Sequence, residues 1–443
     1  MTLQASNRGA EIQIEYPDKG VYVTASRIKE TQGGMTAELL IRADLRIGGK
    51  EDIRELNHSR VNLLNDGDKM RLQNRLQEIV NSSGSIKGDE EFSWASTIPL
   101  VCTAIVAEYR RGTPVIKFDQ PRPVSRRSWL VKDHILKGVP NVLWAEGGSA
   151  KSFWALLTCC LVSRGMSLPQ HGLFASKGNV LYCDWEEDAE LFYTRLMAVN
   201  AGLGIEDYTV APNIMYKKMR GPLSGQVDEL AHLIESENIN YCVMDSVGPA
   251  LGGNGVEQQP VAELFDAMGT LGVTSLLIDH ARKGGDDLYG SVYKGNLARQ
   301  VRKIKKVQMH GSNTLEIMFV HDKANDTGLK PTSSFLVHFD SVTETVDNEH
   351  FEYARSVRFE PISPANVSEE LKGELPILQL TRQYLAEVPP VSLEALVIYI
   401  SGVKQTEIDE RTVMDALVRA DDISVVAGSV SIIERKENRQ LRI

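Results

Sequence analysis

The octapeptide AEGGSAKS, at residues 145–152, follows the apolar run NVLW at residues 141–144 and precedes a segment with helical spacing. It matches the phosphate-loop pattern GxxxxGK[ST], with alanine in place of both outer glycines. In such a loop, backbone N–H groups and the N-terminus of the following helix surround phosphate oxygens, because both carry partial positive charge. The octapeptide therefore predicts a nucleotide site at the end of a buried strand.

The positions of this loop have separate expected roles. We expect the Lys151 ammonium to contact the β and γ phosphates of ATP and the Ser152 hydroxyl to bind Mg²⁺. The backbone that surrounds the phosphates is that of Gly147, Gly148, Ser149 and Ala150. Alanine is costly where φ is positive, so Ala145 and Ala150 are expected to affect turnover more than binding. A degenerate loop that no longer binds nucleotide is the alternative.

From the loop onward, apolar runs of strand length alternate with segments of helical spacing. The runs are NVLWAE, GNVLYCDW, NIMYKKM, INYCVMD and TSLLIDH, and helices are expected from Lys151, Asp188, Gln226 and Gln259. This alternation is typical of a twisted, mostly parallel sheet with helices on both faces. Ligands bind such a sheet at the carboxyl ends of its strands. We therefore predict an α/β P-loop ATPase core over residues 126–360.

Two changes in composition divide the chain into three parts. Residues 11 to about 62 alternate apolar and polar side chains and two helical segments follow, which predicts a small N-terminal α+β domain over residues 1–120. The proline-punctuated stretch FDQPRPVSRRSW is interpreted as a linker. After a second break near residues 361–364, three helical segments and a hairpin predict a C-terminal winged-helix-like domain over residues 370–443, which binds DNA or protein.

Charge and composition narrow the classes of protein. The chain has 443 residues and a formal net charge of -10, which argues against a broadly basic nucleic-acid-binding surface. Its five cysteines show no paired CxxC spacing and are expected to be reduced core residues. No segment reaches the roughly 18 apolar residues of a membrane span, and no apolar signal segment is recognised. We therefore expect a cytoplasmic protein with no membrane partner.

Acidic residues end two other apolar strands. Asp245 closes the run YCVMD and is expected to hold Mg²⁺ as a Walker B carboxylate, although an isolated aspartate after a strand is more often a turn or helix cap. Glu186, Glu187 and Asp188 follow the run LYCDW. Asp188 is expected to cap the next helix, and the two glutamates also suit a helix N-terminus.

Further segments follow in a fixed order. They read DHARKGG at residues 279–285, YGSVY at 289–293, NLAR at 296–299 and KANDTG at 323–328. With the phosphate loop, this order resembles the RecA-like hexameric replicative helicases of the RepA and DnaB type, and related phage and plasmid ATPases with an AAA-type domain. The resemblance covers about half of the chain and implies a RecA-like P-loop ATPase fold.

The resemblance also implies roles for individual polar residues. Glu186 aligns with the glutamate that polarises the attacking water, with Glu187 as the alternative. His280, at the end of the fifth strand, takes the place of the γ-phosphate sensor. Arg299 matches the arginine finger that a neighbouring subunit supplies, with Lys323 assisting it. The alternative for Arg299 is a place in a solvated basic stretch.

Two loops would face the central channel of such a ring. Residues 248–258 are glycine-rich and contain no basic residue, whereas residues 281–290 include Arg282 and Lys283. Contacts from lysine and arginine to phosphate are the expected sequence-independent mode of binding to single-stranded DNA. Single-stranded DNA is therefore an expected partner, and the family resemblance supports this expectation more than the residues of the two loops do.

Two functions remain open. The first is an ATP-dependent single-stranded DNA translocase or helicase that acts in replication of a phage, plasmid or other mobile element. It would be a homo-oligomer that forms a hexameric ring, and a primase or other replication protein is a conceivable partner. The second is a non-motor ATPase, similar to RecA or KaiC, whose nucleotide state controls assembly or partner binding in regulation or defence. Both require ATP and Mg²⁺ as cofactors. They differ in whether single-stranded DNA stimulates hydrolysis.

Overall fold

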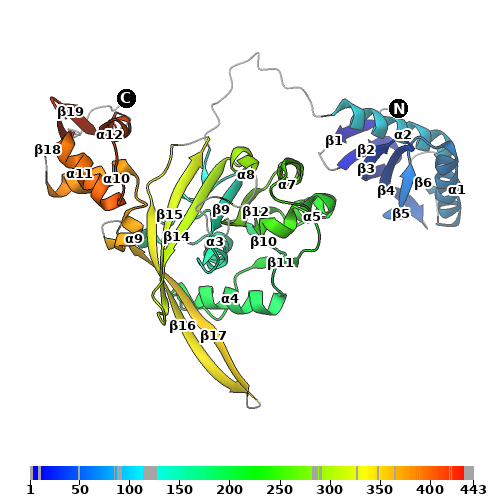
Figure 1. Ribbon diagram of the computed structural model, residues 1–443. Helices are drawn as coiled ribbons and strands as arrows, with labels where there is room; N and C mark the ends of the chain where they lie inside the picture. The colour runs from blue at the N-terminus through cyan, green and yellow to red at the C-terminus, as the bar shows by residue number, and fades with distance from the viewer. Residues whose placement is uncertain are drawn as a thin grey trace, which may run out of the picture. The chain divides into compact units, whose positions relative to one another are not determined.

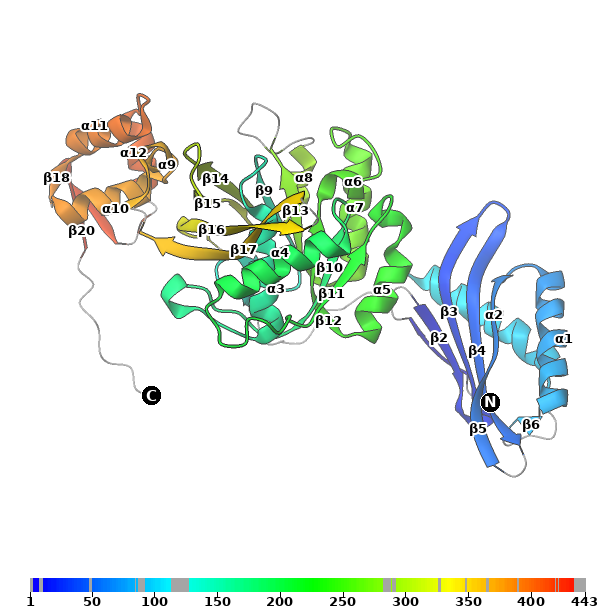
Figure 2. The same ribbon diagram turned by 90° about the horizontal axis from the view of Figure 1, so that it is seen from below.

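The computed structural model describes residues 3–7, 11–47, 50–83, 85–86, 92–112, 127–281, 288, 292–325, 328–346, 349–363, 366–388, 390–418, 420 and 422–433. The chain divides into two compact units. The first comprises Met1–Ser125 with Gln226–His232, and the second comprises Arg126–Gly225 with Leu233–Ile443. Figures 1 and 2 show their helices and strands in two views.

The first unit is an antiparallel sheet with helices packed on its apolar face. Its elements are β1 (Gln4–Asn7), β2 (Glu11–Tyr16), β3 (Val21–Thr31), β4 (Gly34–Ile47), β5 (Lys50–Asn62), α1 (Asp66–Ser83), β6 (Ser85–Ile86) and α2 (Trp94–Arg111). Strands β1 to β5 pair in chain order, and β6 pairs with β4. Alternate residues of β2, Ile12 and Ile14, are buried in one cluster with Leu76 of α1 and Ile98 of α2. The period-two pattern of the sequence therefore buries one face of this sheet.

The second unit is built on a sheet in the order β11-β10-β12-β13-β9-β14-β15-β16-β17. Its strands are β9 (Pro140–Ala145), β10 (Asn179–Asp184), β11 (Ile214–Lys218), β12 (Ile239–Asp245), β13 (Thr274–His280), β14 (Gln300–Val307), β15 (Thr314–Ala324), β16 (Ser333–Val346) and β17 (Glu349–Ile362). The strands from β11 to β14 in this order run parallel to their neighbours, and β15, β16 and β17 continue the sheet antiparallel. The predicted mostly parallel sheet is therefore present.

Helices connect the parallel strands. They are α3 (Lys151–Arg164), α4 (Ala189–Gly202), α5 (Val227–Ser236), α6 (Val247–Ala250), α7 (Gln258–Leu271) and α8 (Val292–Leu297). Leu143 and Val243 are buried in a cluster with residues of α3 and α4. Val142 and Met244, which point to the opposite face of the sheet, are buried as well. Both faces are therefore covered, and the carboxyl ends of β9, β10, β12 and β13 meet at one edge of the sheet.

Strands β16 and β17 form a long hairpin that extends from the sheet (Figure 1). Residues 333–338 of β16 pair with β15, while the pairing of β16 with β17 continues to Val346 and Glu349. Helix α4 approaches β17 closely, because a Cβ on Gly202 would lie 1.9 Å from the carbonyl oxygen of Val357. The sequence patterns above do not predict this hairpin.

The C-terminal part of the second unit contains helices and a small sheet. Its elements are α9 (Glu369–Lys372), α10 (Ile377–Glu387), β18 (Val391–Ser392), α11 (Leu393–Lys404), α12 (Glu410–Leu417), β19 (Ile423–Val426) and β20 (Ser429–Ile432). The sheet order is β18-β20-β19, so the elements follow the winged-helix-like order helix, strand, two helices and hairpin. Leu371, Leu375 and Leu380 share an apolar cluster with Met318 of β15.

A short two-stranded sheet precedes the phosphate loop, with β7 at Trp129–Val131 and β8 at Ile135–Leu136. All five cysteines are free and buried, as expected of reduced core residues. Across the described ranges, none of the helices combines the length and apolar character needed to cross a membrane.

Candidate active site

The phosphate loop joins β9 to α3 at the carboxyl edge of the parallel strands. Inside the loop, the Ser149 hydroxyl donates a hydrogen bond to the Glu146 carbonyl over 2.8 Å. Gly148 has φ +67° and Ala150 has φ +59°, both in the left-handed region that favours glycine. Ala145 is not among the residues with positive φ. Of the two alanines in outer glycine positions, only Ala150 therefore carries a backbone cost.

The Lys151 side chain folds back over the loop. Its ammonium donates to the carbonyl oxygens of Ala145 at 2.9 Å and Glu146 at 2.8 Å. Burial lowers the pKa of Lys151 to about 8, against the opposing attraction of the Asp245 and Glu186 carboxylates. Lys151 therefore has a partly desolvated cation directed at loop carbonyls, and an anionic ligand in the loop would stabilise its charge.

Asp245 and Ser152 present neighbouring oxygen atoms beside the loop. The Asp245 carboxylate accepts a hydrogen bond from the Tyr182 hydroxyl at 2.6 Å and also interacts with the Ser152 hydroxyl. Burial raises the pKa of Asp245, and these two hydrogen bonds oppose the shift. The cap of α6 is Ser246, so Asp245 is not a helix cap. Carboxylate and hydroxyl oxygens are donors that suit Mg²⁺, so the pair fits the expected metal site.

The acidic turn after β10 separates its carboxylates into different surroundings. The Asp184 carboxylate accepts the backbone N–H groups of Glu186 at 2.7 Å and Glu187 at 2.9 Å, which fixes the turn. The Glu187 carboxylate pairs with Arg195. Asp188 accepts the N–H of Leu191 at 2.9 Å and caps α4, as predicted.

Glu186 is the glutamate of this turn that faces the other strand ends. Its Oε1 lies 3.5 Å from Nε2 of His280 and accepts a hydrogen bond from the Ser246 hydroxyl. The hydrogen bond with His280, followed by that from Ser246, lowers the pKa of Glu186 to about 2. In the sheet, His280 pairs with Ala145, so the residue expected to act as sensor lies beside the start of the loop. Glu186 is thus ionised. The positive charge of Lys151 also lowers the pKa of Glu186.

Lys306 is a basic residue at the loop that sequence reasoning missed. Strand β14 runs parallel to β9 with Ile304 opposite Ala145. The Lys306 ammonium donates to the Gly147 carbonyl at 2.5 Å. Strand alternation in the run QVRKIKKV was the available signal, since it places Ile304 and Lys306 on the same side of the strand.

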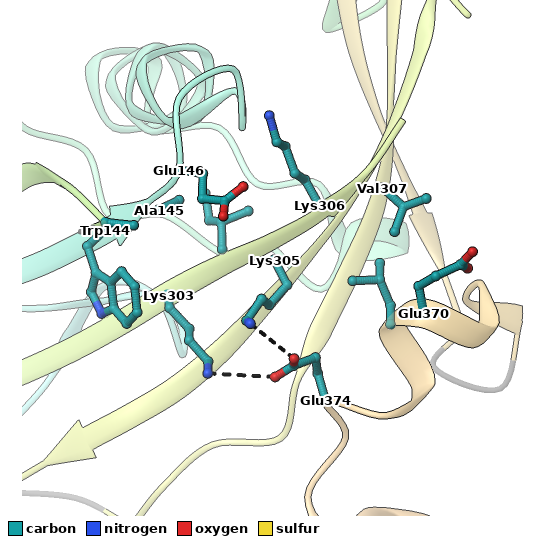
Figure 3. A pocket seen from close by; sticks show the side chains of 12 residues that line it. Trp144, Ala145, Glu146, Lys303, Lys305, Lys306, Val307, Glu370 and Glu374 are labelled. Atoms are coloured by element: carbon teal, nitrogen blue, oxygen red, sulfur yellow. Dashed lines mark ion pairs between the residues drawn. The ribbon is translucent and has the colours of Figure 1, made fainter. Parts of the chain in front are cut away.

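The stretch from Arg302 to Lys306 is not uniformly solvated, unlike the solvated basic stretch that was the alternative for Arg299. Arg302 is buried and donates to the Asp133 carbonyl, and burial lowers its pKa to about 10. Lys303 and Lys305 lie 3.7 Å and 3.0 Å from the carboxylate of Glu374 (Figure 3). The basic side chains of β14 therefore have three different environments.

Arg299 and Lys323 lie at the opposite edge of the sheet from the loop. Gln300, which follows Arg299, pairs with Asn141 at the start of β9 and with Ala324 at the end of β15. The Lys323 ammonium donates to three carbonyls at the end of α8, those of Gly295 at 2.7 Å, Asn296 at 2.8 Å and Ala298 at 2.9 Å. Arg299 is exposed. The chain therefore brings together the loop, Glu186, Asp245 and His280, but not these two basic residues.

The two candidate channel loops differ in how much the structure describes. Residues 248–258 contain the end of α6 and the start of α7, with Val256 exposed between them. In the other loop, residues 282–287 and 289–290 lie outside the described residues, and Arg282 and Lys283 are among them.

Residues 108–286 match the family described as AAA domain. They include the phosphate loop and the strand ends that carry Glu186, Asp245 and His280. This core has the α/β fold with a mostly parallel sheet that the sequence predicts.

A solved structure of a KaiC-like protein from the hyperthermophilic archaeon Pyrococcus horikoshii OT3 is similar to the chain at 17% identity and a TM-score of 0.35. The similarity covers 52% of this chain and 99% of that one. No curated protein matches the chain.

Proposed function

We propose that this chain binds MgATP at residues 145–152 and hydrolyses it. The observation that carries the proposal is the meeting of Lys151, Ser152, Glu186, Asp245 and His280 at the carboxyl edge of β9, β10, β12 and β13. Ligands bind parallel sheets at this edge, and the two kinds of group that hydrolysis requires are both present there. A cationic group faces the loop, and an ionised carboxylate stands beside it.

The residues divide the chemistry between them. Lys151, with the N–H groups at the start of α3, neutralises phosphate charge that grows during transfer. Ser152 and Asp245 would hold Mg²⁺, which would neutralise phosphate charge there. Glu186 is ionised, so it orients the attacking water and accepts its proton as the bond from water oxygen to the γ phosphorus forms and ADP leaves.

The first test is replacement of the loop lysine. Lys151→Ala is expected to abolish release of phosphate from ATP. The melting temperature is expected to stay close to the parental value, because the ammonium contacts loop carbonyls and its burial opposes its charge. Lys137→Ala is the control, since Lys137 is an exposed lysine of the same unit. Hydrolysis by Lys151→Ala at the parental rate would show that this site is not the one that turns over ATP.

We further propose that hydrolysis drives movement on single-stranded DNA, in replication of a phage, plasmid or other mobile element. The order of the segments from Asp279 to Gly328 supports this choice by resemblance, and exposed Arg299 at the far edge of the sheet suits a site shared between subunits. The test measures ATP turnover with and without a single-stranded oligonucleotide, and strand separation on a tailed duplex. Turnover that DNA leaves unchanged would favour the non-motor ATPase.

A further inference from the structure

Lys306 lies over the phosphate loop, in the same chain and from a strand outside the matched residues 108–286. Its ammonium is 2.5 Å from the Gly147 carbonyl oxygen and would lie 3.3 Å from a Cβ placed on Gly148. In Figure 3 its side chain is directed away from Lys303 and Lys305. The register of β14 with β9 fixes this position, because Lys306 follows Ile304 by two residues and therefore shares its side of the strand.

Lys306 differs from its neighbours in its partners. Glu374 neutralises Lys303 and Lys305, whereas no carboxylate in the described part of the chain forms an ion pair with Lys306. Its contact is instead a loop carbonyl, the same kind of partner that Lys151 has. The carbonyls of residues 145, 146 and 147 thus hold two ammonium groups above one loop. The positive charge of Lys306 also lowers the pKa of Lys151.

A carbonyl oxygen is a weak partner for a lysine compared with a phosphate oxygen. The bond from an ammonium to a carbonyl has one charged group, whereas the bond to a phosphate oxygen has two and adds direct attraction between opposite charges. Two ammonium groups that face one loop repel each other, and an anion between them offsets that repulsion. The arrangement is therefore prepared for a ligand with more negative charge than a single lysine neutralises.

We propose that Lys306 is a second phosphate-binding lysine of this nucleotide site, supplied by β14 of the same chain. The inference rests on the proposed binding of ATP at residues 145–152. When ATP binds, the ammonium exchanges the Gly147 carbonyl for a phosphate oxygen. The site then neutralises triphosphate charge with two lysines, one from the helix that follows the loop and one from the strand beside it.

The test compares variants that separate charge from hydrogen bonding. The glutamine of Lys306→Gln can still donate to the Gly147 carbonyl but has no charge, and Lys306→Arg keeps the charge. Lys305→Gln is the matched control, because Lys305 is one residue away and pairs with Glu374. The dissociation constants of MgATP, MgADP and AMP are measured by calorimetry on the full chain at low and high salt, with the melting temperature of each variant.

Lys306→Gln is expected to weaken MgATP binding by about 10- to 100-fold at low salt, as for loss of a charged hydrogen bond. Binding of AMP is expected to change less, and Lys306→Arg to stay within about threefold of the parent. This inference alone would be overturned if Lys306→Gln bound MgATP as tightly as the parent while Lys151→Ala abolished binding. A parental chain that does not bind MgATP would overturn the proposed function and this inference with it.

Discussion

The Glu186 carboxylate and the His280 imidazole face each other across the ends of β10 and β13, with Oε1 and Nε2 3.5 Å apart. Ser246 directly follows β12, the strand between them, and its hydroxyl donates to the same carboxylate oxygen. One residue expected to orient water is thus in contact with another expected to sense the γ phosphate. A nucleotide that contacts His280 would change the surroundings of Glu186 directly.

The first prediction concerns which glutamate acts on water. Glu186→Gln is expected to retain MgATP binding and lose hydrolysis by at least about 100-fold, because an amide does not accept a proton from water as a carboxylate does. Glu187→Gln is the matched control, since its carboxylate pairs with Arg195 and not with the strand ends. Binding calorimetry and phosphate release measure the two effects separately. Unchanged hydrolysis in Glu186→Gln, with loss in Glu187→Gln, would transfer the role to Glu187.

The second prediction concerns the pH dependence that His280 imposes on Glu186. The pKa of Glu186 is held at about 2, chiefly by His280, against an ordinary value of 4.5. A carboxylate that accepts a proton must be ionised, so its contribution to turnover is lost as pH falls through its pKa. In His280→Ala that loss is expected near pH 4.5, and in the parent well below it.

The measurement is the ratio of kcat for His280→Ala to kcat for the parent between pH 7 and pH 4.5. We expect the ratio to fall about twofold over this range, which corresponds to half protonation at the ordinary pKa. Ser246→Ala should give a smaller fall, because Ser246 contributes less to the low pKa. A ratio that does not vary with pH would show that His280 does not control the ionisation of Glu186 during turnover.

Strands β10, β12 and β13 of the parallel core could be predicted from the sequence because each is a short apolar run that ends in a polar residue at the same edge. Asp245 and His280 are such residues, so their places followed from the pattern. The contact of Lys306 with the loop depends on the pairing of β14 with β9. Which strands become neighbours is decided by the packing of the whole sheet, so local periodicity leaves it open.

The hairpin of β16 and β17 could not be predicted for a related reason. Its position against α4 depends on Gly202, which leaves room for the Val357 carbonyl. A glycine near the end of a helix is common as a helix terminator, so its sequence position carries no sign of such a contact. The environments of Arg302, Lys303 and Lys305 likewise depend on what faces each side of β14.

The third prediction compares the two alanines in outer glycine positions. Ala150 has φ +59°, a conformation that costs an L-residue about 1–2 kcal/mol and glycine almost nothing. Ala150→Gly is expected to leave the free energy of unfolding equal or to raise it by up to about 1 kcal/mol, and to raise kcat. Ala145→Gly, at the buried end of β9, is expected to lower that free energy by about 1 kcal/mol. Denaturant unfolding and phosphate release test both. A destabilised Ala150→Gly would contradict the assigned backbone conformation.

The fourth prediction concerns the pH dependence of ATP binding through Lys151. Its pKa is about 8 in the folded chain against an ordinary 10.5, so the unfolded chain binds this proton more tightly. The burial of Lys151 therefore destabilises the fold below pH 8, and the penalty disappears as pH rises towards 10.5.

A bound phosphate favours the ammonium, so ATP binding is expected to take up a proton above pH 8. The affinity for MgATP should fall above pH 8, by at most about tenfold per pH unit. Calorimetry at pH 7 and pH 9.5, in buffers with different ionisation enthalpies, measures the affinity and the proton uptake together. Equal affinity at both values, with no proton uptake, would show that Lys151 is not the group in contact with phosphate.

The last prediction is a site shared between subunits. Arg299 is exposed at the edge of the sheet opposite the loop, so it does not reach the loop of its own chain. An arginine that reaches a transferring phosphate from a neighbour accelerates hydrolysis by roughly 10³ to 10⁵ in systems where it has been measured. Arg299→Ala is therefore expected to bind MgATP normally and to hydrolyse it at a small fraction of the parental rate. Arg411→Ala, which changes an exposed arginine of α12, is the control.

A mixing experiment separates a shared site from a local effect of Arg299. Arg299→Ala keeps an intact loop and Lys151→Ala keeps an intact Arg299, so their mixture should regain activity at interfaces that combine the two. Lys323→Met is expected to lower the melting temperature as well as turnover, because its ammonium binds the three carbonyls at the end of α8. Light scattering with an ATP analogue and Mg²⁺ should show hexamers. A monomer whose turnover per chain is independent of concentration, with no gain on mixing, would exclude the arginine finger and the ring together.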